Sequence, residues 1–260
     1  MDCRMDGRTA IVTGGSMGLG RAIAHEFARS GANVAMVARR QDVLDEAKAE
    51  IAADAAGKVE SFVCDMSDAV AIGPMFDAVT AALGPVDIIV NNAGSSQRGP
   101  FLEITDAMWQ ADLELKLFGA IRLTRLAFPG MIERRWGRII NVLNVGAKAP
   151  AATGAPTVVS RAAGMALTKV LAGEGAPHNV LVNALLVGRI VSDQIARRHA
   201  AADTNQSLED YIAEAGEAIP MGRMGTAQEF ANMATFLASD AGSYVTGTAI
   251  NVDGNLSSVV

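Results

Sequence analysis

A short glycine-rich segment near the start of the chain has the residues to bind phosphate. Residues 13–20 read Thr-Gly-Gly-Ser-Met-Gly-Leu-Gly, and Gly14, Gly18 and Gly20 fall where an apolar run gives way to a helical pattern. Glycines at such a turn let backbone N–H groups approach a pyrophosphate at the positive end of the helix. Ordinary turns can carry the same spacing. Its place at the first strand-to-helix turn of an alternating chain nevertheless favours a dinucleotide site.

Two arginines further along bear on which dinucleotide binds. Arg39 and Arg40 follow the second apolar run, about twenty residues past the glycines. An acidic residue there would bind the ribose hydroxyls of NAD, whereas an arginine accommodates the 2′-phosphate of NADP. No Asp or Glu lies within two residues of Arg39. The sequence therefore predicts NADP(H) in preference to NAD(H), the alternative being that both arginines belong to a solvated helix start.

The elements that must position these residues alternate along the whole chain. Apolar runs rich in β-branched residues are separated by longer helical patterns, which predicts right-handed βαβ crossovers and an α/β fold with a doubly wound parallel sheet. No linker interrupts the pattern, so residues 1–260 are expected to form a single domain. The polar stretch 190–220, after the sixth run, is predicted to be a helical lid insertion over the ligand edge of the sheet. The expected strands are 9–13, 33–38, 59–64, 86–90, 138–142, 180–185 and 248–252, and the expected helices are 19–30, 42–53, 69–83, 106–131, 156–174 and 226–238.

Composition restricts the classes of protein and of partner. Half of the 260 residues are hydrophobic, only 19% are charged and the net charge is −6, which indicates a globular protein. An acidic chain is a poor partner for nucleic acid or an anionic membrane. The two cysteines fit neither a disulfide framework nor a metal pattern, so no metal is predicted. No apolar run of about 18 residues and no signal-peptide core occur, which favours a cytoplasmic protein.

Further motifs complete a family pattern. Asp65 follows the third run, Asn91-Asn-Ala-Gly94 follows the fourth, and Asn251-Val-Asp-Gly254 stands near the end. With the glycine-rich turn, they closely resemble the short-chain dehydrogenase/reductase family over essentially the whole chain. The resemblance implies a Rossmann-type domain with a seven-stranded sheet, usually a homotetramer, that transfers hydride between NAD(P)H and a carbonyl or alcohol. The predicted cofactor-binding residues are Gly14, Ser16, Met17, Gly18, Leu19, Gly20, Arg39, Asp65, Met66, Asn92, Ala93, Gly94, Arg161, Gly188, Ile190 and Ser192.

The same resemblance exposes four departures at the catalytic positions. In the family, Tyr exchanges the substrate proton, Lys lowers the Tyr pKa and holds the ribose, Ser orients the carbonyl, and Asn anchors a water relay. The only tyrosines here are Tyr211 and Tyr244, so no Tyr shifted along the catalytic helix can substitute. The residues that stand for Asn, Ser, Tyr and Lys are Lys116, Asn144, Thr157 and Arg161, and these four are the candidate catalytic residues.

Three kinds of function fit an intact cofactor site beside altered catalytic positions. The first is an oxidoreductase with non-standard proton chemistry, in which Asn144 polarises the carbonyl. Thr157 is a poor acid and Arg161 stays charged, so another group must supply the proton. The second is a cofactor-binding pseudo-enzyme subunit. The third is a lyase or isomerase that uses the site's cations to stabilise an enolate. A preserved cofactor site favours the first.

Lys116 is the predicted proton source. Like charge from Arg161 and partial burial should both lower its pKa from about 10.4 toward neutrality. The amine could then donate a proton to an alkoxide through water and Thr157. The alternative is that Lys116 points to solvent or pairs with Glu114 or Asp112.

The lid bears on the substrate, a small carbonyl or alcohol compound. The sequence places four basic residues against Asp193 in the first part of the lid, in an otherwise acidic chain. A cationic patch there would attract an anionic substrate or an acyl thioester. The alternative is a solvated helix face balanced by the acids of 203–217. The basic residues are Arg189, Arg197, Arg198 and His199.

Overall fold

Seven parallel strands form one sheet in the computed structural model, which describes residues 1–201 and 205–260. Their order is β3-β2-β1-β4-β5-β6-β7, so the direction of winding reverses between β1 and β4. Ligands bind at such a switch point in open parallel sheets, beyond the carboxyl ends of the strands. The predicted doubly wound α/β domain is confirmed. The strands are β1 (Thr9–Thr13), β2 (Asn33–Ala38), β3 (Val59–Val63), β4 (Val86–Asn91), β5 (Gly137–Asn144), β6 (Val180–Val187) and β7 (Ala249–Val252).

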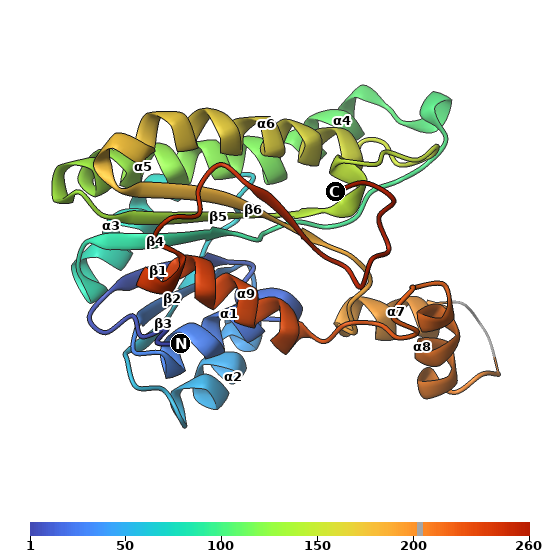
Figure 1. The fold of residues 1–260 in the computed structure, drawn as a ribbon, viewed down its shortest axis with the longest axis horizontal. Helices are drawn as coiled ribbons and strands as arrows, with labels where there is room; N and C mark the ends of the chain where they lie inside the picture. Colours follow the sequence, from blue (N-terminus) through green and yellow to red (C-terminus); the bar gives the residue numbers. More distant parts are fainter. Residues whose placement is uncertain (202–204) are drawn as a thin grey trace.

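Helices cover both faces of the sheet (Figure 1). Helices α1, α2 and α9 pack on one face, and α3, α5 and α6 pack on the other. The central strands are therefore buried on both sides, which explains why they read as continuous apolar runs rather than as alternating patterns. The helices are α1 (Gly18–Arg29), α2 (Gln41–Ala52), α3 (Ile72–Leu83), α4 (Asp106–Leu113), α5 (Gly119–Arg134), α6 (Thr157–Gly175), α7 (Asp193–Ala201), α8 (Leu208–Glu217) and α9 (Ala227–Ala238).

The long helix predicted over 106–131 is interrupted. A π-helical turn, Glu114–Phe118, separates α4 from α5 and carries Lys116. The turn lies where the backbone passes close to its neighbours, since a Cβ on Gly119 would lie only 2.6 Å from the Met66 carbonyl oxygen. Single π turns inside α-helices often occur at functional sites because they change the direction of side chains. Periodicity alone does not distinguish this turn from a continuous helix.

The described parts of the segment 190–220 include two helices, α7 and α8, beyond the end of β6 (Figure 1). It is tied to the domain at its start, where Val191 N–H donates to the Gly225 carbonyl at 2.9 Å. His199 packs against the Tyr211 ring at a centroid distance of 5.4 Å and joins the two helices. The side chains of Arg197 and Arg198, on which part of the anionic-substrate prediction rests, lie outside the described residues. No described helix is long and apolar enough to cross a membrane.

Candidate active site

The glycine-rich turn is closed by contacts that leave no room for side chains. Asn92 Nδ2 donates to the carbonyl oxygens of Thr13 at 2.9 Å and of Gly14 at 3.3 Å. Gly14 has a φ of +65°, which favours glycine. A Cβ on Gly20 would overlap the Gly14 carbonyl oxygen and lie 2.5 Å from Asn92 Nδ2. The side chain of Asn92 thus joins the end of β4 to the backbone at the end of β1, at the switch point.

The start of α1 is available to an anion. Met17 occupies the N-cap position without a side-chain capping hydrogen bond, and the first turn of α1 has no acidic residue. The positive end of the helix is therefore not neutralised by a carboxylate of its own. Arg40 lies beside this turn, because its Nη2 is 3.2 Å from Met17 Sδ. The glycine-rich turn and the start of α1 therefore fit a dinucleotide pyrophosphate. Arg40 lies closer to this turn than its place beside Arg39 in the sequence indicated.

Arg39 and Asp65 face each other across the ends of β2 and β3. Arg39 Nη1 is 3.9 Å from Asp65 Oδ2, and the Arg39 side chain is 74% exposed. Burial alone would raise the pKa of Asp65, but hydrogen bonds from Ser67 and the charge of Arg39 lower it. An exposed guanidinium beside a partly exposed ion pair remains available for a phosphate group. The preference for NADP(H) through Arg39 stays a prediction.

Several predicted cofactor residues present backbone rather than side chain. Met66 and Ile190 are 4% and 7% exposed and belong to the hydrophobic core, and Leu19 packs against the same core. Only the backbone of Met66 and Ile190 is left for a ligand. Gly188 lies tight against β7, because a Cβ there would be 2.5 Å from Asp253 Cβ. Ser16, Ser192 and Ala93 are partly exposed at the ends of β1, β6 and β4.

Thr157 stands at the start of α6 and is buried, with 1% exposure. Its hydroxyl accepts hydrogen bonds from Gln97 N at 2.9 Å and from Lys116 Nζ at 2.8 Å. The structure thus brings two of the four predicted catalytic residues into direct contact. It also shows that the Thr157 hydroxyl faces the interior.

Asp112 is the group that sequence reasoning placed only among alternatives. It lies one helical turn before Lys116 and forms an ion pair with it, and the two side chains are 2% and 4% exposed. Ser160 Oγ donates to Asp112 Oδ2 at 2.6 Å, and Thr157 Oγ1 donates to Asp112 Oδ1 at 3.4 Å. We call Asp112, Lys116, Thr157 and Ser160 the buried polar cluster. The i, i+4 spacing of Asp112 and Lys116 is visible in the sequence, but Ser160 is brought to them only by the packing of α6.

The charges around the cluster determine its ionisation. Burial lowers the pKa of Lys116 most, Asp112 opposes that shift, and the charges of Arg161 and Arg98 lower the pKa further. Burial likewise lowers the pKa of Arg161 to about 10, with Asp112 opposing. Arg161 therefore stays protonated at neutral pH, and the direction predicted for the Lys116 pKa is confirmed. The pairing with Asp112, given as the alternative, also occurs, and the role of Lys116 as the proton source stays a prediction.

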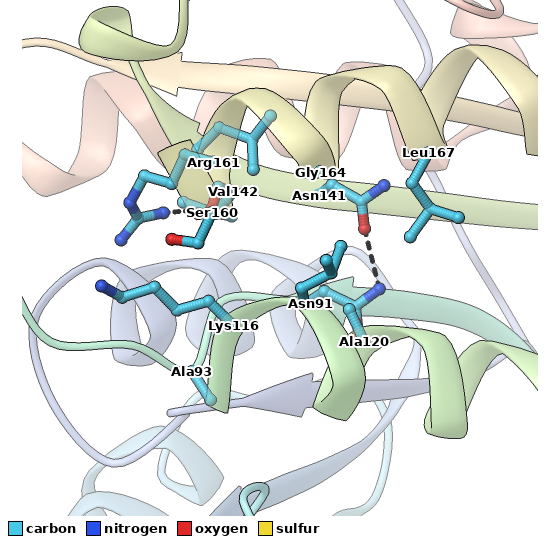
Figure 2. A pocket seen from close by; sticks show the side chains of 12 residues that line it. Asn91, Ala93, Lys116, Ala120, Asn141, Val142, Ser160, Arg161, Gly164 and Leu167 are labelled. Atoms are coloured by element: carbon cyan, nitrogen blue, oxygen red, sulfur yellow. Dashed lines mark hydrogen bonds between the residues drawn. The ribbon is translucent and has the colours of Figure 1, made fainter. Parts of the chain in front are cut away.

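Arg161 and Asn144 each have a buried polar atom without a hydrogen-bond partner. Arg161 Nη1 donates to the Val142 carbonyl at 2.7 Å, while its Nε is buried without a partner (Figure 2). Asn144 Oδ1 is also buried without a partner. Among the described residues, no hydrogen bond joins Asn144 to Lys116, Thr157 or Arg161. Asn144 is thus separate from the buried polar cluster.

A small cavity lies beneath these residues (Figure 2). It offers about 10 Å³ to the centres of water-sized molecules, which is room for about one water. Lys116, Ser160 and Arg161 lie at one end, and Asn91 lies at the other, where its Nδ2 donates to Asn141 Oδ1 at 2.8 Å. In the described ranges no group of three or more His, Cys, Asp or Glu could hold a metal ion.

Known proteins are similar to this chain over most of its length. A family model described as "Enoyl-(Acyl carrier protein) reductase" matches residues 14–257. The 3-oxoacyl-[acyl-carrier-protein] reductase FabG of Aquifex aeolicus is 32% identical over 256 residues, covering 98% of this chain and all of the relative. Nodulation protein G of a Rhizobium species is 36% identical over 260 residues, covering 98% of this chain and 99% of that protein.

Solved structures match over the same extent. L-sorbose reductase from Gluconobacter frateurii, complexed with NADPH and L-sorbose, superposes with a TM-score of 0.95 at 31% identity, over the full length of both chains. Levodione reductase superposes with a TM-score of 0.90 at 28% identity, covering 99% of this chain and all of the other. The similarity therefore includes the whole fold and not only the cofactor half.

Proposed function

Since the chain belongs to the short-chain dehydrogenase/reductase family and is an oxidoreductase by that relationship, we propose that it interconverts a small carbonyl compound and its alcohol with NADP(H), using proton chemistry without a tyrosine. The observation that supports this best is the closed glycine-rich turn, whose contacts with Asn92 require glycine at positions 14 and 20. A binding module that no longer handled a dinucleotide would have no need for such a restricted turn.

The cofactor, when bound, supplies or accepts a hydride at its nicotinamide ring. Arg161 would hold the ribose and stabilise an oxyanion, because it is a permanent cation fixed by Val142. Asn144 would polarise the substrate carbonyl with its amide, since no described residue accepts a hydrogen bond from Asn144 Nδ2. Asn144 stands at the carboxyl end of β5, and Arg161 stands near the start of α6.

Lys116 would supply the proton. Its ammonium already donates to Thr157 at 2.8 Å, and burial with two neighbouring arginines lowers its pKa. An acid works best with a pKa near the working pH. Asp112 keeps a proton in the cluster by opposing that shift.

The preference for NADP(H) rests on Arg39, with Arg40 beside the glycine-rich turn. Three structures with similar folds, two of L-sorbose reductase and one of actinorhodin polyketide ketoreductase, were solved with NADPH.

Both cysteines of this chain are free, which fits the proposed cytoplasmic location.

We also propose a homotetramer. Phe118 and Leu126 of the π turn and α5, and Val159 and Val170 of α6, are between 38% and 58% exposed. Adjacent apolar faces on neighbouring helices favour burial against another copy. Light scattering should report a tetramer of the 27.0 kDa chain, and a stable monomer would refute this proposal.

A panel of carbonyl compounds and alcohols tests the function. Purified protein is first shown to bind NADPH by fluorescence, and turnover is then followed by NADPH absorbance. Turnover that depends on the cofactor supports the proposal. Tight NADPH binding without turnover of any compound would favour the pseudo-enzyme, and loss of substrate without a change in NADPH would favour a lyase or isomerase.

A further inference from the structure

The charges around Lys116 do not balance. Lys116 and Arg161 both lie close to Gly94, where a Cβ would be 3.5 Å from Lys116 Cγ and 3.3 Å from Arg161 Nη2. Arg98 adds a third positive charge beside Thr157 through its bridge to Pro156, and Asp112 is the carboxylate that pairs with Lys116. Both Asp112 oxygens are already engaged, Oδ1 by Lys116 and Oδ2 by Ser160. The region therefore holds an excess of positive charge with no carboxylate left to receive it.

Arg161 supplies the buried part of this excess. Its guanidinium and the Lys116 ammonium extend toward the same side of the site, away from Asn91 and Asn141 (Figure 2). Nη1 is held by Val142, whereas Nε is buried without a partner. No described residue accepts a hydrogen bond from Nη2, which lies near the exposed Gly94, since a Cβ there would be 3.3 Å from it. Nη2 is therefore the part of the guanidinium that a ligand acceptor can reach.

Arg98 supplies the exposed part of the excess positive charge. A β-bridge between Arg98 and Pro156 fixes its backbone at the start of α6, and Gln97 is bonded to Thr157 in both directions. The Arg98 side chain is exposed, and no described residue forms a hydrogen bond or ion pair with it. Its bridge to Pro156 places Arg98 beside Thr157, whose hydroxyl accepts a hydrogen bond from Lys116 Nζ at 2.8 Å, and its charge lowers the pKa of both Lys116 and Arg161. One arginine is thus rigid and the other is free to close on a ligand.

The cofactor does not supply the missing negative charge. Its pyrophosphate belongs at the start of α1, and its 2′-phosphate belongs near Arg39. The nicotinamide and its ribose, which would lie nearest Arg161, carry no negative charge. The anion must therefore belong to the substrate. Guanidinium groups match planar carboxylates, which can accept two parallel hydrogen bonds.

We propose that Arg98 and Arg161 form a carboxylate subsite, so that the substrate is a small oxo acid or hydroxy acid. The inference rests on the proposed oxidoreductase function and gives its substrate a chemical class. It places the contacts with the anion at Arg98 and Arg161 rather than in the lid. Arg161, which would also hold the ribose, anchors the carboxylate through Nη2, and Arg98 closes on it from the exposed side.

Calorimetry on the NADPH-saturated protein tests the subsite without turnover. Oxalate is the probe, because it resembles the carboxylate and carbonyl of a 2-oxo acid, and oxamide is its neutral counterpart. Oxalate should bind at least tenfold more tightly than oxamide. Arg98→Gln should weaken oxalate binding about tenfold and leave oxamide unchanged, while Arg98→Lys should lose less. Arg125→Gln, which removes the same charge from an exposed position on α5, should change neither.

Three results would overturn the subsite: equal binding of oxalate and oxamide, oxalate binding unaffected by Arg98→Gln, or tighter binding of inorganic phosphate than of oxalate. The proposed function fails separately. If oxalate binds as expected but no oxo or hydroxy acid is turned over, the subsite stands and the oxidoreductase does not. If neutral ketones are reduced and oxalate does not bind, the oxidoreductase stands and the subsite does not.

Discussion

The glycine-rich turn and the buried polar cluster lie at the same edge of the sheet but are built from different materials. The turn is mainly backbone held by the Asn92 side chain, and Gly14 and Gly20 leave no space there for a Cβ. The cluster is four side chains from α4, the π turn and α6, joined by hydrogen bonds and one ion pair. A backbone site can be preserved only by keeping its glycines.

A side-chain site has more freedom to change, provided that its charges change together. A lysine alone at position 116 would be a buried cation, and such a group is costly without a partner. Asp112, one turn earlier, provides the partner, and Ser160 satisfies its second oxygen. The glycine-rich turn is therefore tied to its glycines, whereas the buried polar cluster is held together by charges that depend on one another.

Replacing the proposed acid should have the largest effect. Lys116→Met and Thr157→Val should each slow carbonyl reduction about 10²–10⁴-fold if the proton passes between them. The donor must be protonated, and its pKa is lowered, so wild-type reduction should decline as pH rises through that lowered pKa. Lys116→Met should lose this decline. Full activity of both variants with unchanged pH profiles would place the acid in the lid or on the substrate.

Breaking the ion pair between Asp112 and Lys116 should have the next largest effect, on the free energy of unfolding rather than on the reaction rate. Asp112→Ala leaves a buried lysine without its partner and should lower the free energy of unfolding by about 3–5 kcal/mol. Asp112→Leu combined with Lys116→Met should recover most of that loss. The matched control is Glu60→Ala, which breaks the partly exposed Lys48–Glu60 pair and should cost about 0–1 kcal/mol in urea unfolding. Equal costs for Asp112→Ala and Glu60→Ala would contradict the account of the cluster.

A side chain in the glycine-rich turn should weaken the cofactor and leave the cluster alone. Gly20→Ala would force the Gly14 carbonyl or Asn92 to move, and losing one or two phosphate hydrogen bonds of about 1.5–3 kcal/mol each predicts roughly 100-fold weaker NADPH binding. Gly73→Ala in α3 is the control, because its Cβ would meet nothing within 4 Å. Titration by NADPH fluorescence measures both. Unchanged affinity in Gly20→Ala would show that the turn does not bind phosphate.

The smallest expected effect is a change in the affinity for NADP(H) relative to NAD(H). Arg39→Ala should lose about tenfold in NADP(H) affinity, because one phosphate–arginine contact contributes about 1.5–3 kcal/mol. NAD(H) affinity should stay the same and serves as the internal control. Tighter binding of NAD(H) than of NADP(H) by the unaltered protein would show that the exposed Arg39 has no phosphate to bind.

Much of the scaffold could be predicted because its signals are local. Apolar runs such as Val86–Asn91 and the glycines of residues 13–20 occupy the predicted positions. The π turn at Glu114–Phe118 could not be predicted, since its residues have the same periodicity as a helix. The side-chain burial of Met66 and Ile190 also depends on distant packing.

The sequence by itself determined the fold and the glycine-rich turn, because each follows from residue types at fixed spacings along one segment. Only the tertiary structure decided which groups surround Lys116 and Thr157. Asp112 and Lys116 are four residues apart, but Ser160 and Thr157 reach them from α6 across more than forty positions. The charge of a buried lysine depends on which groups surround it in space. Packing therefore joins Lys116 and Thr157 to Asp112 and Ser160, while Asn144 stays outside this network.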